Sequence, residues 1–446
     1  MINHKLRHLP LAAAALVACA GAHAGYQSPD GNFSLSGFGT LGVAKTSTNE
    51  VIMNYPGQRG GATRHAKFDP DSKLAVQGTY KFAPTFSATT QVMTKFDGDG
   101  QYEPKVEWIF GKWQATPGLS IRAGRMGAPY FMISDFRDVG YANLAVRPQL
   151  EVYGQVSVSQ FEGADISYQL NLGDTAITSS LWAGDSHTKY TSVLTKTSSV
   201  LDVKKTRGIT VNADLGNGIT LRGGHTRGEI NVKNDGGTLL KAGVAGLQDA
   251  LTPYLAIPTA SAASATLNTV YALVNPDNDK ATFNGIGMTY DVDNWVFNTE
   301  FTKRKTKGFI ADTTGMYAQL GYRVNSFTPY VGLAKIKSDR RASNPVYSTA
   351  LSGGLAAFNS SFTTIRQGVQ QTLNTQKFDQ KTFTLGSRWD YSSNLALKFQ
   401  WDRTSKPADA GGVFLAKSSD AELSNTSFTA TKKTVHVFTL SADFVF

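Results

Sequence analysis

Hydrophobic and polar positions alternate along most of this chain, and the clearest case is its last segment, residues 434–446. Every second position from 438 onward is apolar, and the positions between are mostly polar. The apolar set is Phe438, Leu440, Ala442, Phe444 and Phe446. A period of two places the two sets on opposite faces of a β-strand. The pattern therefore predicts a strand that is apolar on one face and runs to the last residue.

The same alternating unit recurs through the chain, and its length of about ten residues is that of a tilted strand crossing a bilayer. Turn-forming residues give seven short connections, near 83–84, 116–118, 173–174, 216–218, 293–294, 325–326 and 392–394. Eight longer polar connections lie between them, near 46–70, 96–104, 127–162, 185–204, 231–280, 305–311, 339–377 and 407–431. The alternation of short and long connections predicts sixteen antiparallel strands, with both chain ends on the short-turn side.

Aromatic residues cluster beside the short turns. Tyr80, Phe82 and Phe86 flank the first turn, and Trp389 and Tyr391 precede the last one. Amphipathic rings prefer a lipid–water interface, so we expect them to form a girdle at the short-turn edge of the barrel. A soluble β-sandwich with core aromatics is the alternative, but it explains neither the short–long rhythm nor the terminal phenylalanine.

Two segments of the long connection near 231–280 depart from the strand pattern. Thr238–Leu251 and Ser261–Val274 are rich in alanine and leucine. We expect short helices there that cap the mouth of the barrel or fold over it.

Several segments resemble a known family, the sixteen-stranded porins of Gram-negative bacteria. Residues 33–44 (FSLSGFGTLGVA) look like a porin first strand, and residues 74–92 look like the hairpin that follows. The chain end, with Phe444 and Phe446, resembles the C-terminal assembly signal of outer-membrane barrels. The resemblance implies an all-β transmembrane antiparallel barrel of sixteen strands, with long extracellular loops and the third loop folded inward. That loop, 127–162, lacks the Pro-Glu-Phe-Gly segment of the general diffusion porins.

The N-terminus has the features of a secretory signal peptide. Lys5 and Arg7 form a basic region, residues 9–22 are apolar and small, and Ala22-His23-Ala24 is an A-x-A cleavage site. A lipoprotein box ending at Cys19 is the alternative, and it would leave that residue acylated. Cys19 is the only cysteine, so the mature chain would contain no disulfide. We expect a signal peptide at 1–24 and a porin β-barrel at 25–446.

Charged residues on the lumen-facing parity are candidates for a pore constriction. Arg122, Arg222, Arg388 and Lys398 lie opposite the apolar residues of their strands, three or four residues from a short turn. A charge that faces lipid costs about 2–4 kcal/mol, so these side chains should point inward. We predict that they form a basic wall facing the third loop. Without Lys5 and Arg7 the formal net charge falls from +10 to +8, which favours anions.

The third loop supplies acidic groups opposite this wall. Asp135, Asp138 and Glu151 are the candidates, with Arg137 and Arg147 tempering their charge. A basic wall opposite carboxylates makes a transverse field that orients dipolar solutes. The alternative is a set of scattered, solvated charges, because acids share the lumen parity: Glu107, Glu300, Asp390 and Asp402.

Patterns typical of enzymes and metal sites lack the context that they need. Gly37–Gly42 matches G-x-G-x-x-G but lies within a strand, and Ser186–Lys189 matches S-x-x-K without companion motifs. The histidines after residue 24 are dispersed, so we predict no metal site and no cofactor. Loop carboxylates can bind calcium or cations that bridge lipopolysaccharide, at Asp69, Asp71, Asp97 and Asp99. The basic residues do not cluster with stacking aromatics, so no nucleic-acid partner is expected.

The sequence as a whole predicts an outer-membrane pore rather than an enzyme. It would pass small hydrophilic solutes and ions down their gradients, with a mild anion preference. The porin resemblance implies a homotrimer, the barrel-assembly machinery as a partner, and contact with outer-membrane lipid and lipopolysaccharide. A substrate-specific channel for anionic solutes, such as carboxylates or phosphate, is the main alternative. An outer-membrane barrel enzyme is the third hypothesis.

Overall fold

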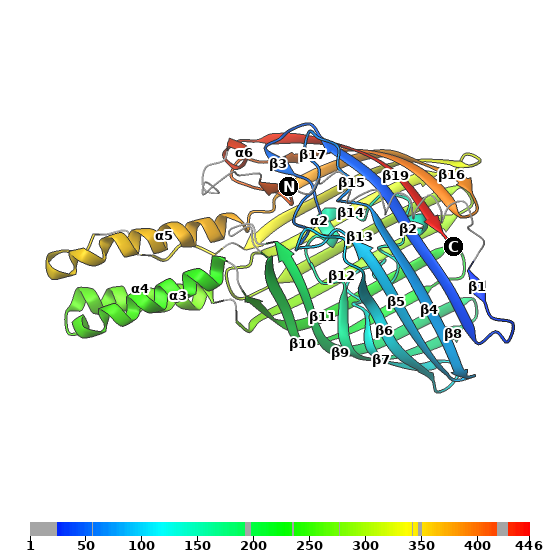
Figure 1. Cartoon of the computed structure of the whole chain (residues 1–446), viewed down its shortest axis with the longest axis horizontal. Helices are drawn as coiled ribbons and strands as arrows, with labels where there is room; N and C mark the ends of the chain where they lie inside the picture. The colour runs from blue at the N-terminus through cyan, green and yellow to red at the C-terminus, as the bar shows by residue number, and fades with distance from the viewer. Residues whose placement is uncertain are drawn as a thin grey trace.

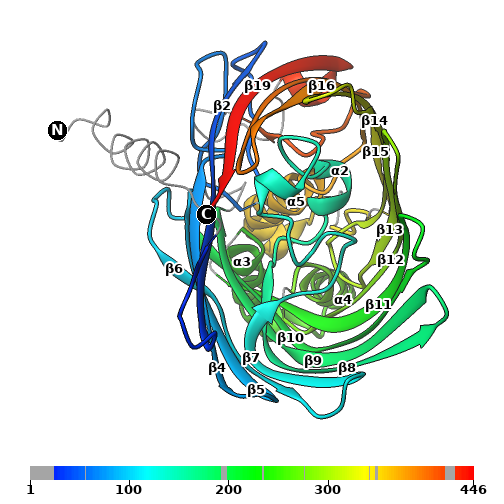
Figure 2. The same ribbon diagram turned by 90° about the vertical axis from the view of Figure 1, so that its right-hand side faces the viewer.

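The computed structural model describes residues 25–446 except 56, 192–197, 234–235, 276, 341, 347–349 and 417–426. The predicted signal peptide, residues 1–24 with Cys19, lies outside the described residues. Sixteen long strands form one closed antiparallel barrel (Figures 1 and 2). They are β2 (Phe33–Thr46), β4 (Lys73–Ala83), β5 (Phe86–Lys95), β6 (Lys105–Gln114), β7 (Leu119–Gly127), β8 (Gln160–Leu172), β9 (Thr175–Thr191), β10 (Ser198–Asp214), β11 (Ile219–Lys233), β12 (Asp279–Val292), β13 (Trp295–Lys305), β14 (Asp312–Tyr322), β15 (Phe327–Arg340), β16 (Gln380–Ser392), β17 (Leu395–Lys406) and β19 (Lys433–Val445).

The first and last long strands close the ring. β19 pairs with β2 from Val437 opposite Thr46 to Val445 opposite Phe38. Beyond β19, the amide of Gly37 donates to the carbonyl of Phe446 at 2.7 Å, and the amide of Phe446 donates to the carbonyl of Gly37 at 2.9 Å. Each of the sixteen strands therefore has a partner on both sides, which removes the exposed edges of an open sheet. The predicted sixteen-strand antiparallel barrel is confirmed.

All seven short turns lie where the sequence predicts them, between β4 and β5, β6 and β7, β8 and β9, β10 and β11, β12 and β13, β14 and β15, and β16 and β17. Several need a residue with positive φ: Gly173 (61°), Gly216 (73°), Asp293 (53°) and Asn325 (54°). Glycine, asparagine and aspartate are the residues that adopt this conformation most readily, so local sequence determines where the hairpins turn.

One predicted loop was wrong. Residues 185–204 do not form an extended polar loop, because β9 continues to Thr191 and β10 begins at Ser198, directly opposite. Polar side chains can remain in the ladder because the neighbouring strand satisfies their backbone groups on each side. The two strands, each of 17 residues, therefore reach beyond the length that alternation alone predicts.

The outer surface carries the expected aromatic girdle beside the short turns. Phe86 stacks on Trp113 with ring centroids 5.9 Å apart, and Phe327 stacks on Trp389 at 5.4 Å. Trp295 packs edge-on against Tyr322 at 4.7 Å. These are cross-strand pairs between neighbouring strands, and most of the rings are exposed at the barrel surface. Such pairs stabilise the sheet and place amphipathic rings on its outer face.

A few short strands and a short helix lie outside the sixteen long strands. β1 (Tyr26–Gln27) pairs with β2, and β3 (Val51–Ile52) pairs with β18 (Leu415–Ala416). The helix α6 (Ser427–Ala430) precedes β19. The first and last long loops are thereby tied together at the end of the barrel opposite the short turns.

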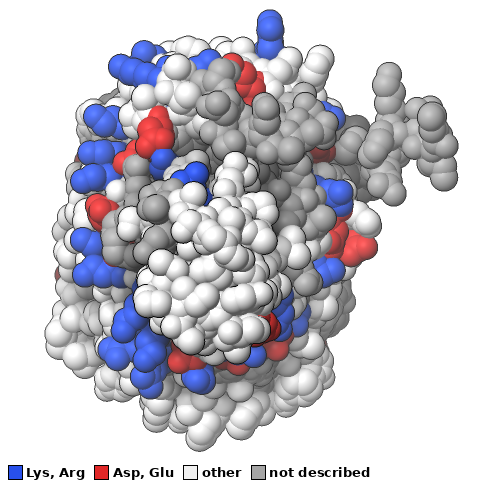
Figure 3. Space-filling view, turned by 90° about the vertical axis from the view of Figure 1, so that its left-hand side faces the viewer, with Lys and Arg blue, Asp and Glu red and all other residues white. Residues whose placement is uncertain are grey.

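A helical projection extends away from that same end (Figure 1). It consists of α3 (Gly236–Leu251), η3 (Thr252–Tyr254), α4 (Pro258–Val274), η4 (Gly353–Phe358) and α5 (Asn359–Asn374). α3 and α4 confirm the two predicted helices; they stand over the end of the barrel and extend away from it rather than folding flat across the mouth. Leu251, Leu267 and Val369 are fully buried in a core that the helices share with Phe309 of the connection between β13 and β14, so their apolar faces pack mainly on one another. Figure 3 shows mostly uncharged residues on this projection and lysines and arginines around it.

Among the described residues, no helix is both long enough and apolar enough to cross a membrane.

Candidate pore constriction

The connection between β7 and β8, residues 128–159, crosses the inside of the barrel and is called L3 below. It contains η2 (Gly140–Ala142) and α2 (Leu150–Tyr153), and α2 lies within the ring of strands in Figure 2. η2 contacts β2 and β19, whereas α2 contacts β13, β14 and β15. L3 thus bridges separate parts of the wall and narrows the lumen.

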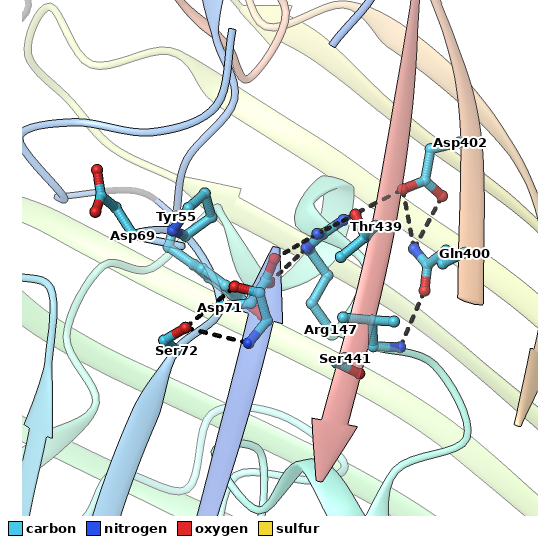
Figure 4. Close-up of polar contacts among 12 residues, drawn as sticks. Tyr55, Asp69, Asp71, Ser72, Arg147, Gln400, Asp402, Thr439 and Ser441 are labelled. Carbon is cyan, nitrogen blue, oxygen red and sulfur yellow. Dashed lines mark hydrogen bonds and ion pairs between the residues drawn. The ribbon is translucent and has the colours of Figure 1, made fainter. Parts of the chain in front are cut away.

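Arg147 fastens the middle of L3 to the wall (Figure 4). Its Nε and Nη2 donate to the two carboxylate oxygens of Asp71 at 2.9 and 2.7 Å. Nη1 donates to Asp402 of β17 at 3.3 Å, and Nη2 also donates to the hydroxyl of Thr439 on β19 at 2.7 Å. The guanidinium is thus bidentate to one carboxylate and bridges to a second, and all three charged side chains are buried.

Burial alone would lower the pKa of Arg147, but Asp71 and Asp402 outweigh it and raise that pKa above its ordinary value. A buried ion pair gains little net stability against an apolar replacement, yet removing one partner leaves an uncompensated charge. Without Arg147, Asp71 and Asp402 would be left as buried charges without a cation. This cost keeps the middle of L3 in one position.

Both ends of L3 are held on the opposite side of the barrel, the start by aromatic packing and the end by a hydrogen bond. Phe131 is fully buried and packs edge-on against Phe283 of β12 at 5.2 Å, and Tyr130 does the same with Trp182 of β9 at 5.6 Å. Near the other end, the hydroxyl of Tyr153 donates to Glu300 of β13 at 2.7 Å. L3 is thereby fixed at its start, middle and end.

Three of the four predicted basic wall residues contact L3, and they do so through its carbonyl oxygens. Arg222 Nη2 donates to Pro129 at 2.6 Å, and Arg388 Nη1 donates to Tyr141 at 2.5 Å and to Asn143 at 3.1 Å. Lys398 is fully buried and donates to the carbonyls of Gly140 at 2.7 Å, Asn143 at 2.6 Å and Ala145 at 3.2 Å, beside Asp443 at 3.1 Å. These cations position L3.

The structure does not bring the four cations into one contiguous wall. Arg388 and Lys398 lie directly opposite each other on β16 and β17, but Arg222 is on β11 and Arg122 on β7. Arg122 instead makes a bidentate ion pair with Asp165 on the neighbouring strand β8, with Nε 2.9 Å from Oδ2. The exposed carboxylate of Asp135 acts electrostatically on both Arg122 and Arg222.

Asp138, a predicted acid of L3, lies among cations that the predicted wall does not include. Its carboxylate is 3.4 Å from Lys73 Nζ of β4 and 3.4 Å from Lys95 Nζ of β5, and Arg137 lies at 3.7 Å. Lys95 also lies 3.2 Å from Glu107 of β6. Burial would raise the pKa of Asp138, but Lys95, Lys73 and Arg137 outweigh it and lower that pKa well below its ordinary value.

Glu151, the third predicted acid, faces no cation within ion-pair distance among the described residues. The carboxylate is buried in α2 and accepts hydrogen bonds from Gln380 Nε2 at 2.7 Å and from the hydroxyl of Thr382, both on β16. Burial raises the pKa of Glu151, and these hydrogen bonds only partly offset it. Glu151 thus positions α2 against the wall.

Sequence reasoning missed Lys73 and Lys95, although a signal was present. Lys73 shares its parity with Ala75 and Gln77 on the lumen side of β4, and Lys95 shares its parity with Gln91 on β5. Both lie far from a short turn. The other four cations were selected because each lies three or four residues from a short turn, so this criterion excluded Lys73 and Lys95.

The lumen beside L3 divides into two cavities. The charged chamber, of about 720 Å³, is lined by residues that include Lys73, Lys95, Lys105, Glu107 and Arg125, together with Arg137 and Asp138 of L3. The apolar chamber, of about 500 Å³, is lined by residues that include Leu201, Val203, Ile230, Val232, Phe283 and Ile336. Both chambers are bordered by Gly57, Val156 and Ser157, so they meet at the end of L3.

The predicted assembly signal lies on the closing seam of the barrel. The ring of Phe444 covers Gly39 of β2, and the ring of Phe446 covers Gly37; a Cβ on either glycine would come within 2.3 Å of a ring carbon. The two rings stack at 6.3 Å. The first two glycines of the G-x-G-x-x-G pattern, Gly37 and Gly39, thus provide space for aromatic rings within a strand.

The other enzyme-like and cation-binding patterns are engaged in local pairs. His187, within the S-x-x-K pattern, contacts Asp202 at 2.6 Å. Lys105 pairs with Asp97, and Lys189 pairs with Asp99 at 3.0 Å. Asp71 is held by Arg147, as described above. Among the described residues, no group of three or more histidine, cysteine, aspartate or glutamate side chains is arranged to hold a metal ion.

No family model and no curated protein matches this chain. Several solved structures do match. The outer membrane channel DcaP of Acinetobacter baumannii has a TM-score of 0.50 and 10% sequence identity, over 95% of this chain and 100% of that chain. OmpF of Salmonella typhi, in a complex with daunomycin, has a TM-score of 0.49 and 12% identity, over 94% and 99% of the two chains.

An anion-selective porin from Comamonas acidovorans also matches, with a TM-score of 0.49 and 12% identity, over 93% of this chain and 99% of that chain. At identities of this size, structural likeness is evidence for the fold. The predicted porin fold is confirmed.

Proposed function

We propose that this protein is a porin of a Gram-negative outer membrane, a water-filled channel for passive diffusion of small hydrophilic solutes and ions. One observation carries the proposal. The sixteen strands close into a barrel with apolar residues and an aromatic girdle outside and a charged chamber of about 720 Å³ inside. A barrel that is apolar outside and polar inside is stable in lipid and encloses an aqueous path.

We place the constriction in the charged chamber, between L3 and the strands β4–β6. There Lys73, Lys95 and Arg137 surround Asp138, with Glu107 beside Lys95. Three cations lie close to two carboxylates in this group, and we propose that a small anion meets a slightly favourable field beside them. This balance supports a mild anion preference.

The predicted candidates take two roles in this proposal. Asp138 and Arg137 line the constriction, and Arg122 and Asp135 contribute charge below it, on the short-turn side. Arg222, Arg388, Lys398 and Glu151 act by holding L3 in position, through the contacts described above. The pore radius would then depend on anchors that a solute never touches.

Assembly and export complete the proposal. We propose that residues 1–24 are a cleaved signal peptide and that residues 25–446 are the barrel. Phe444 and Phe446 would be read by the barrel-assembly machinery, and the mature barrel would form a homotrimer in contact with lipid and lipopolysaccharide. An unheated gel that shows a species of three chains would support the trimer, and a monomer in mild detergent would contradict it.

Planar-bilayer recording of the refolded protein tests the proposal. Under a KCl gradient we expect stepwise conductance with a reversal potential on the anion-selective side. A folded barrel without conductance would overturn the channel and make the barrel enzyme the leading hypothesis, to be tested with lipase and protease assays. A cation-selective pore would keep the channel and overturn the assigned constriction.

A second candidate function, a substrate-specific channel for anionic solutes, is favoured by the apolar chamber and by Arg304 at its wall.

A further inference from the structure

The apolar chamber differs from the lumen of a pore built only for ions. Barrel interiors that hold water are lined mainly by polar side chains. Here the extracellular halves of β10 and β11 turn Leu201, Val203, Ile230 and Val232 toward the cavity, and Phe283 of β12 continues this apolar surface. A wet cavity wall of this kind is stabilised when an apolar solute covers it.

Arg304 of β13 stands at the wall of this chamber, which Arg227, Lys377 and Asp409 also line. A guanidinium has five N–H donors. Two of its nitrogens make hydrogen bonds, both to backbone carbonyls: Nη1 to Gln155 at 2.6 Å and Nη2 to Ala311 at 3.1 Å. Nε is buried without an acceptor, and the guanidinium lies 5.8 Å from the centroid of the Phe378 ring. Among the described residues, no carboxylate forms an ion pair with Arg304.

The acids nearest in electrostatic terms are engaged elsewhere. Asp312 and Asp279 act on Arg304 at longer range. Asp312 accepts the amide of Thr306 at 2.9 Å, and Asp279 accepts the amides of Lys307 and Gly308, both at 2.9 Å. These carboxylates hold the turn between β13 and β14. Arg304 is therefore a half-buried charge without a carboxylate in ion-pair contact among the described residues, an arrangement that an anion from outside would stabilise.

We propose that the apolar chamber is a binding site for a small aromatic carboxylate, which enters before passing the constriction. This inference rests on the proposed channel function. The ring of the solute lies against Phe283 and Ile230, and its carboxylate accepts hydrogen bonds from the remaining N–H groups of Arg304. Phenylalanine rings at 283, 309 and 378 line the chamber and favour an aromatic body over an alkyl chain. Its volume, about 500 Å³, lies within the usual range for small-molecule sites.

Equilibrium dialysis of the refolded protein with radiolabelled benzoate tests the site without depending on conductance. Acetate keeps the charge and lacks the ring, and benzyl alcohol keeps the ring and lacks the charge. We expect saturable benzoate binding, with both comparison solutes at least about tenfold weaker, because a charge-assisted hydrogen bond and ring burial each contribute on that scale. Acetate or benzyl alcohol binding as tightly as benzoate would overturn the proposal, as would no saturable binding.

Two substitutions locate the site, and a third serves as the control. Arg304→Gln removes the charge and should weaken benzoate binding by about tenfold or more. Ile230→Asn makes a part of the wall two strands away polar and should weaken binding to a smaller extent; it keeps the test valid if Arg304→Gln does not fold. Arg323→Gln, at an exposed ion pair with Asp291 outside both chambers, should bind benzoate as the unsubstituted protein does.

Bilayer recordings separate this inference from the channel itself. Conductance without benzoate binding would overturn the aromatic-carboxylate site and leave the channel standing. Benzoate binding to a barrel that does not conduct would support the site and overturn the channel. Unchanged binding in both Arg304→Gln and Ile230→Asn would place benzoate elsewhere and so overturn the proposal.

Discussion

The two chambers beside L3 lie in one barrel and share a border at Val156 and Ser157, yet their charged groups are arranged differently. In the charged chamber, cations and carboxylates pair across strands and onto L3, as Lys73, Lys95 and Asp138 do. In the apolar chamber, aliphatic and aromatic side chains form much of the wall, Lys377 pairs with Asp409, and Arg304 has no carboxylate within ion-pair distance among the described residues. Paired charges make a field that small ions cross, whereas an unpaired cation in an apolar wall holds an anion in one place.

The comparison teaches that one loop can divide a lumen into a path and a binding site. L3 forms part of the wall of both chambers, and its anchors come from β11, β13, β16, β17 and β19. Changes to the anchors should therefore affect both chambers together, and changes to a chamber wall should affect only one.

The largest effect is expected from Arg147→Gln, which should abolish the distinction between the chambers. Asp71 and Asp402 would be left buried without a cation, at a cost of about 3–5 kcal/mol. We expect a lower urea midpoint for unfolding in lipid vesicles and a higher, noisier single-channel conductance as L3 detaches. The exposed pair of Arg323 and Asp291 gives the control, since Arg323→Gln should cost at most about 1 kcal/mol. An Arg147 variant with normal stability and conductance would refute the anchoring role.

The next largest effect should be confined to the charged chamber. Replacing both Lys73 and Lys95 by glutamine leaves Asp138 and Glu107 with Arg137 alone. We expect the reversal potential in a KCl gradient to move to the cation-selective side, with a several-fold change in the permeability ratio. Benzoate binding should stay within about twofold, because additivity holds for separated sites. A selectivity that remains anionic would move the constriction away from these lysines.

Asp138→Asn should change the same property in the opposite direction. Lys73, Lys95 and Arg137 would lose their shared carboxylate, so anion preference should rise. The low pKa of Asp138 keeps it charged through the neutral and mildly acidic range, so the difference between variant and parent should persist from pH 8 to about pH 5. A difference that vanishes on mild acidification would show that Asp138 is not held by these cations.

Smaller changes are expected from Arg122→Ala and Arg222→Ala. Arg122 is paired with Asp165, and Arg222 donates a hydrogen bond to the carbonyl of Pro129. Each therefore contributes less uncompensated charge to the lumen than Lys73 and Lys95 do. Both variants should lower anion preference modestly in reversal-potential measurements. If neither moves the reversal potential, these residues are not part of the selectivity field.

The smallest effect should come from Glu151→Gln and should depend on pH. A carboxyl whose pKa is raised in the folded state binds its proton more tightly there, so its contribution to stability falls as pH rises through that raised value. Glutamine keeps an oxygen for Gln380 and Thr382 but does not ionise. We expect similar unfolding midpoints for variant and parent at pH 4 and a slightly higher midpoint for the variant at pH 8. A variant that is less stable at pH 8 would mean that the charge itself is needed.

Local patterns were sufficient for the barrel. Alternation along strands and turn residues such as Gly216 and Asn325 are properties of neighbouring residues, so they give strands and hairpins directly. Strand order followed because consecutive strands pair in an antiparallel meander. The length of β9 and β10 could not be read in this way, because polar residues near 188 and 199 remain in the ladder through pairing with each other.

The candidate site was predicted only in part, because parity gives the face of a side chain and not its partner. It placed Lys398 and Arg388 inward, but not on the carbonyls of residues 140–145. The apolar chamber was missed for a different reason. A bulge between Lys204 and Arg207 shifts the register of β10, so Val203 and Thr206 line the same cavity although their parities differ. One extra residue in β10 thus changes which positions face the lumen, so strict alternation does not predict this apolar wall.

The seam between β2 and β19 also constrains when the barrel can close. The contact that completes the barrel joins Gly37 and Gly39 to Phe446 and Phe444, which lie at opposite ends of the barrel sequence. Until they arrive, two strand edges carry unpaired amides and carbonyls, which are templates for aggregation. The ring can therefore close only when both of these strands are present, and its two edges need protection until that contact forms.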